Sequence, residues 1–136
     1  MLFEYPLTVP LNTLEADPET LECPLAAGTV IRVDVQFPAG CSGMVHVSIW
    51  RSDHQVWPVN LDEGIAGEDA IVSWPESYDL DDEPFGFEVR GWSPDTAYPH
   101  VITFRFALLS LEEAQSSRGL PGLLRRLAAL LLGRES

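Results

Sequence analysis

Apolar and polar residues alternate along most of the first 110 positions, which is the pattern of β-strands that bury one face. In the clearest stretch Ile31, Val33, Val35 and Phe37 alternate with polar residues, and Pro38 ends the run. Further segments of this kind or shorter apolar runs lie at residues 3–9, 20–25, 45–49, 55–59, 70–74, 85–89 and 101–109. No helical period separates them, so the sequence predicts seven or eight short antiparallel strands.

This succession of strands predicts an all-β fold, an antiparallel β-sandwich of immunoglobulin-like or jelly-roll type that occupies residues 1–110. Within each strand, every second residue should face the core. Its expected members are Ile31, Val33, Val35, Val45, Val47, Ile49, Phe87, Val89, Phe104 and Phe106. Cys23 and Cys41 are too close in sequence for the immunoglobulin inter-sheet pair, so we expect two reduced, half-buried cysteines, with a disulfide as the alternative.

The character of the chain changes after residue 110. Residues 111–119 include Ser116, Ser117 and Gly119 and predict a hinge, and Pro121 suits the first turn of a helix, which we expect at 120–133. This helix is amphipathic, because six leucines fall within an arc of about 120°. They are Leu120, Leu123, Leu124, Leu127, Leu130 and Leu131. We expect this stripe to dock on a protein partner; packing on the sandwich of the same chain and association with a membrane are the alternatives.

The charge is strongly acidic, with 21 acids, eight arginines, no lysine and a net charge of −13. Residues 1–110 hold eighteen acids and four arginines, whereas residues 111–136 hold three acids and four arginines. Such a body is a poor partner for nucleic acid or anionic lipid. The first residues also lack the basic and apolar regions of a signal peptide, and no apolar run is long enough to span a membrane, so a cytoplasmic location is expected outside a particle.

The sequence contains no recognisable catalytic motif. His46, His54 and His100 are scattered, and no serine lies in a nucleophile elbow. The acidic segments 62–69 and 79–83 have oxygen ligands at calcium-like spacing, but Pro84 stands where an EF-hand has its turn glycine. We therefore predict a protein that is not an enzyme, with no cofactor and no metal, and leave calcium binding by the acidic segments open.

Three tryptophans near strand ends are candidate partner-binding residues beside the leucine stripe: Trp50, Trp57 and Trp92. Trp50 and Trp92 fall on the side opposite the aliphatic residues of their strands. Exposed tryptophans are common in binding hot spots. Either these rings form a contact surface for protein or carbohydrate, or a loop or a second subunit covers them.

Residues 37–47, Phe-Pro-Ala-Gly-Cys-Ser-Gly-Met-Val-His-Val, and residues 54–58, His-Gln-Val-Trp-Pro, lie in an acidic chain that we expect to be all-β and to have no signal peptide. In this combination the chain resembles small structural proteins of tailed bacteriophages, and is most similar to head decoration or cement proteins. The resemblance implies a non-enzymatic virion component that binds a capsid-like lattice or itself, often as a trimer. The alternative hypothesis is a carbohydrate-binding or adhesion module.

Overall fold

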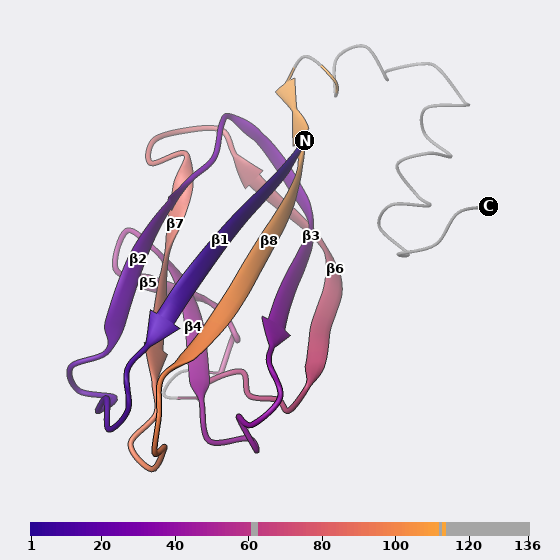
Figure 1. Ribbon diagram of the computed structural model, residues 1–136. Coiled ribbons are helices and arrows are strands. Elements are labelled where there is room, and N and C mark those ends of the chain that lie inside the picture. The colour runs from indigo at the N-terminus through magenta and orange to yellow at the C-terminus, as the bar shows by residue number, and fades with distance from the viewer. Residues whose placement is uncertain (61–62, 112, 114–136) are drawn as a thin grey trace.

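The computed structural model describes residues 1–60, 63–111 and 113. Eight strands form two antiparallel four-stranded sheets, which confirms the all-β prediction (Figure 1). The strands are β1 (Leu2–Val9), β2 (Glu19–Pro24), β3 (Gly28–Phe37), β4 (His46–Arg51), β5 (His54–Trp57), β6 (Ala70–Leu80), β7 (Gly86–Trp92) and β8 (His100–Ser110). The predicted helix at 120–133 and most of the predicted hinge lie outside the described residues. Within those residues no helix is long and apolar enough to cross a membrane.

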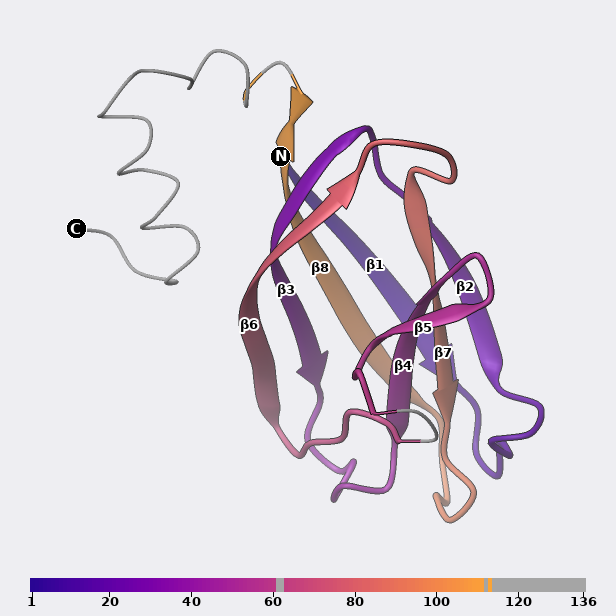
Figure 2. The ribbon, with the colours of Figure 1, turned by 180° about the vertical axis from the view of Figure 1, so that it is seen from behind.

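The strand pairs are nested, so that each early strand lies beside a late one. One sheet has the order β1-β8-β3-β6 and the other has the order β2-β7-β4-β5. The first strand thus pairs with the last, β2 with β7, β3 with β6, and β4 with β5. Figure 2 shows the two layers from the side on which β5 and β6 form neighbouring edges.

The two sheets share one hydrophobic core. Phe87 of β7 stacks on Phe106 of β8 with 5.2 Å between the ring centroids, which joins the layers at the centre. Every predicted core residue is buried, and all except Ile31 belong to a single cluster. The pairing of β3 shifts register between Val30 and Arg32, so Val30 and Val33 both join the core while Ile31 does not. The prediction that every second residue of this strand faces the core is therefore wrong near the start of the strand, where the register shifts.

Both cysteines are free and fully buried, rather than half-buried as predicted. Burial, together with the nearby carboxylate of Glu22, raises the pKa of Cys23 to about 12. Burial also raises the pKa of Cys41, with a smaller contribution from Glu68. Both side chains behave as small apolar residues of the core.

The two acidic segments that were candidate calcium ligands lie at opposite ends of β6. Residues 63–69 precede this strand and the turn at 81–84 follows it, so about 33 Å of extended chain separates them. Asp79 belongs to β6 itself, where its Oδ1 accepts a hydrogen bond of 2.9 Å from Thr29. Asp62 lies outside the described residues. Elsewhere in the described chain no three His, Cys, Asp or Glu side chains gather as a metal site.

Candidate functional site

The outer face of the sheet β2-β7-β4-β5 carries polar and aromatic side chains in adjacent rows. Alternation in β7 turns Val89 into the core and Glu88 and Arg90 outward. In β4 the same alternation buries Ile49 and turns Trp50 outward. Because β4 and β7 are paired neighbours, these outward side chains lie beside one another.

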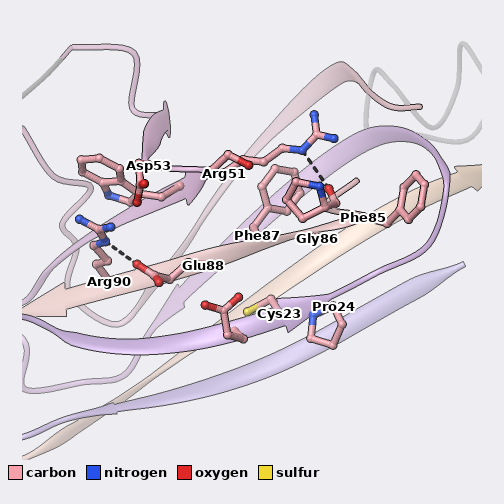
Figure 3. A pocket seen from close by; sticks show the side chains of 13 residues that line it. Cys23, Pro24, Arg51, Asp53, Phe85, Gly86, Phe87, Glu88 and Arg90 are labelled. Carbon is pink, nitrogen blue, oxygen red and sulfur yellow. Dashed lines mark hydrogen bonds and ion pairs between the residues drawn. The ribbon is translucent and has the colours of Figure 1, made fainter. Parts of the chain in front are cut away.

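Two hollows lie on this face, and both are lined by Trp50, Asp53 and Arg90. The first has a volume of about 400 Å³ and the second about 500 Å³. Figure 3 shows the first hollow, with Glu88 and Arg90 of β7 beside it and Cys23 and Pro24 on the strand below. Its remaining lining comes mainly from Glu22, Arg51, Ser52, Pro84 and Phe85. We call the surface that holds both hollows the Trp50–Arg90 face.

The centre of this face is a stacked pair. The guanidinium carbon of Arg90 lies 3.9 Å from the centroid of the Trp50 ring, which is a close cation–π contact. Nε of Arg90 is also 2.6 Å from Oε1 of Glu88, and Nε1 of Trp50 donates a hydrogen bond of 2.7 Å to Ser48. One ring face of Trp50 is therefore covered by the arginine, and the half-buried side chain is held in a fixed orientation.

Two carboxylates meet on the Trp50–Arg90 face, because Glu22 of β2 is the register partner of Glu88 of β7. Burial raises the pKa of Glu22, and the hydrogen bond and repulsion from Glu88 raise it further. The second arginine of the first hollow, Arg51, bonds to Asp82 and to the carbonyl oxygen of Pro84. Both arginines are thus already paired, and the face carries excess negative charge.

Trp57, one of the predicted partner-binding residues, lies in the core. It is 6% exposed, and its ring contacts those of Trp74, Tyr78 and Phe87. Its Nε1 donates a hydrogen bond of 2.7 Å to Glu76. Trp57 closes the space between the edges of β5 and β6 and has no free ring face for a ligand.

Trp92 is also buried, at 8% exposure, although it points outward from its sheet. The ring of His46 stacks on it at 5.9 Å, and the loop that contains Gly64 lies so close that a Cβ there would be 2.9 Å from the indole. Ile65 of this loop exchanges backbone hydrogen bonds with Val47. A loop therefore covers Trp92, as one of the two interpretations predicted, and only Trp50 remains half-exposed among the three candidates. The six candidate leucines at 120–131 lie outside the described residues.

A second group of polar residues lies at the end of the molecule near residue 40. His100 is 4% exposed, and neither ring nitrogen has a hydrogen-bond partner among the residues that the structure describes. Glu68 accepts hydrogen bonds from the backbone nitrogens of Ser42 and Gly40, at 2.6 and 3.0 Å, and these bonds lower its pKa. Burial raises the pKa of the Cys41 thiol, and a raised pKa disfavours the thiolate that a nucleophilic cysteine needs.

Sequence reasoning identified Trp50 but missed Glu22, Glu88 and Arg90. Their positions on an outward strand face could be read from the alternation, but the contacts depend on which strands pair and in which register. Comparison of the sequence with protein-family models and with curated proteins finds no match.

Proposed function

We propose that the described domain is a jelly roll. The support is the nested pairing of the first strand with the last, β2 with β7, β3 with β6 and β4 with β5, because a jelly roll is a ribbon of paired strands rolled into two sheets. Jelly rolls occur in capsid proteins and in lectins, so the topology alone does not choose between a structural and a sugar-binding role.

We propose further that the chain is a non-enzymatic interaction protein that binds a protein surface through its Trp50–Arg90 face. The observation that carries this proposal is the half-exposed Trp50, stacked on Arg90 between two hollows. Tryptophan and arginine are among the residue types most enriched in protein-binding hot spots. The setting we propose is a virion whose shell the domain decorates, and the net charge of −13 would keep free copies apart until a shell captures them.

A carbohydrate-binding module is the second candidate. The same hollows bring a half-exposed indole close to planar polar side chains such as Gln55, Glu88 and Arg90, which are the groups that hydrogen-bond sugar hydroxyls. The weaker point of this candidate is the ring itself, since Arg90 covers one face of Trp50 and the other two candidate tryptophans are buried.

Co-sedimentation with phage capsids from the native source of the chain tests the leading proposal. We expect the wild-type chain to pellet with the particles and Arg90→Ala to weaken binding about tenfold or more, as at a hot spot. Arg32→Ala is the matched control, because Arg32 also pairs with a carboxylate two residues away but lies on the other sheet. Equal loss in both variants, or no binding by the wild type, would overturn the proposal. A saturable glycan-array signal that Trp50→Ala abolishes would establish the carbohydrate candidate instead.

A further inference from the structure

We propose that residues 118–134 of the same chain dock on the Trp50–Arg90 face and cover it until a partner displaces them. This inference rests on the proposed function, because it describes how the same binding face is regulated. It also gives the leucine stripe an occupant in the free protein, so that the two predicted partner-binding elements shield each other.

The first argument is charge. All four arginines of the described domain are already paired with carboxylates: Arg32 with Asp34, Arg51 with Asp82, Arg90 with Glu88, and Arg105 with Glu4. The other four arginines of the chain all lie in residues 118–134, a stretch that contains no acid. The most cationic segment of the chain therefore complements the face on which two carboxylates oppose each other.

The second argument is the mixed chemistry of the first hollow. Its carboxylates stand beside the apolar surfaces of Pro24, Trp50, Pro84 and Phe85. A purely cationic ligand would leave this apolar surface in water, and a purely apolar ligand would leave the excess negative charge of the face uncompensated. Residues 118–134 alternate short runs of leucine with arginine and offer both kinds of contact.

The third argument is reach. The last residue of β8, Ser110, pairs with Gly28, so their Cα atoms are about 5 Å apart. From Gly28 back to Pro24, which lines the first hollow, is four residues, or at most about 14 Å. The chain thus leaves β8 within about 20 Å of the hollow, and eight further residues to Arg118 span up to about 28 Å. A tether this short gives a high effective concentration of the segment at its own face, which favours docking within one chain.

Photo-crosslinking of the full chain tests the inference directly. Phe85→p-benzoylphenylalanine places the crosslinker in the first hollow, and Ile71→p-benzoylphenylalanine places it at an exposed position of β6 on the other sheet as a control. After irradiation we expect the hollow position to crosslink to the tryptic peptides 119–125 and 127–134, in material of monomer mass. The control position should not. Absence of these crosslinks, equal crosslinking from the control, or crosslinks only in dimers would each overturn docking within the chain.

Charge reversal in the tail provides the second arm. Arg125→Glu with Arg126→Glu should lower the crosslink yield about fivefold, the loss that weakening two surface ion pairs produces, and Arg125→Lys with Arg126→Lys should restore most of it. Hydrogen exchange on the same full-length variants, without the crosslinker, should show faster exchange at residues 50–54 and 85–90 after reversal. Unchanged exchange there would contradict the inference even if the crosslinker variant failed to fold.

Capsid co-sedimentation of the same samples separates this inference from the proposed function. Particle binding that depends on Arg90, without tail crosslinks, would overturn tail docking and leave the proposed function standing. Tail crosslinks in a chain that never binds particles would overturn the proposed function and leave tail docking standing.

Discussion

The outer faces of the two sheets follow the same rule of alternation but differ in how their polar groups meet. On the sheet β1-β8-β3-β6, Arg105 joins Glu4 and Gln36, each at 2.7 Å, and so links three neighbouring strands. Asp34 there accepts hydrogen bonds from both Arg32 and Ser73. On the sheet β2-β7-β4-β5, two carboxylates oppose each other and hollows flank a half-exposed tryptophan.

This difference shows that strand register, and not composition, decides whether like or opposite charges face each other on a sheet. Arginines pair with carboxylates on both faces, but among the described residues only on the second does one carboxylate, Glu22, lie opposite another, Glu88, across a strand pair. Polar groups that satisfy each other gain little from a ligand. Polar groups that do not satisfy each other gain favourable contacts when a complementary surface binds.

The edges of both sheets oppose the addition of a further strand. Three of the four edge strands contain a proline: Pro6 in β1, Pro24 in β2 and Pro75 in β6. The fourth, β5, has only four residues. Proline and short length both oppose the addition of another strand, so a partner that extends a sheet is disfavoured and contact through side chains is favoured.

The largest expected effect on stability comes from a core residue that packs between the two sheets. Phe87→Ala removes a ring that stacks on Phe106 and contacts Trp57 in the shared core. We expect a loss of about 3–5 kcal/mol in the free energy of unfolding, since a cavity forms between the sheets. Denaturant unfolding measures this loss, and hydrogen exchange should show that protection falls on both sheets. A loss confined to one sheet would mean that the two faces do not share a core.

Two substitutions with smaller effects, one on each face, should change the free energy of unfolding in opposite directions. Glu4→Gln breaks the ion pair with Arg105 and should cost about 0.5 kcal/mol. Glu22→Gln removes the repulsion from Glu88 and should raise the free energy of unfolding by about 0.5 kcal/mol at pH 7. Unfolding curves of the two variants beside wild type provide the measurement.

The sign of the Glu22 effect follows from its raised pKa. Folding favours the protonated carboxyl, so the ionised form destabilises the fold fully above the raised pKa, and the penalty disappears as the pH falls below the ordinary value of glutamate. The advantage of Glu22→Gln should therefore vanish on acidification. An advantage that persists at low pH, or a loss of stability at pH 7, would show that the two carboxylates do not repel each other.

The sequence predicted strands and buried residues well because alternation is a local property. Val47, Ile49, Phe104 and Phe106 are buried as their parity requires. Prediction from the sequence failed where contacts with a neighbouring strand decide whether a residue is buried. The register shift at Val30 breaks parity, and Trp57 is buried because β6 brings Trp74 and Tyr78 against it from a distant part of the chain. The Trp50–Arg90 face was only half predictable for the same reason, since its opposed carboxylates come from two strands distant in sequence.

The smallest expected effect on stability is that of removing the tail. Truncation after Glu113 leaves all eight strands and their shared core in place, so only the surface contacts that we propose for the tail would be lost. We expect the melting temperature to fall by no more than about 4 °C, since a loss near 1 kcal/mol shifts a domain of this size by only a few degrees. Iodide should then quench tryptophan emission more strongly than in the full chain, and Trp50→Phe should abolish this gain, because Trp50 is the half-exposed indole at the centre of the uncovered face. A fall of many degrees would instead place the leucines in the core of the domain, and docking on the Trp50–Arg90 face would be wrong.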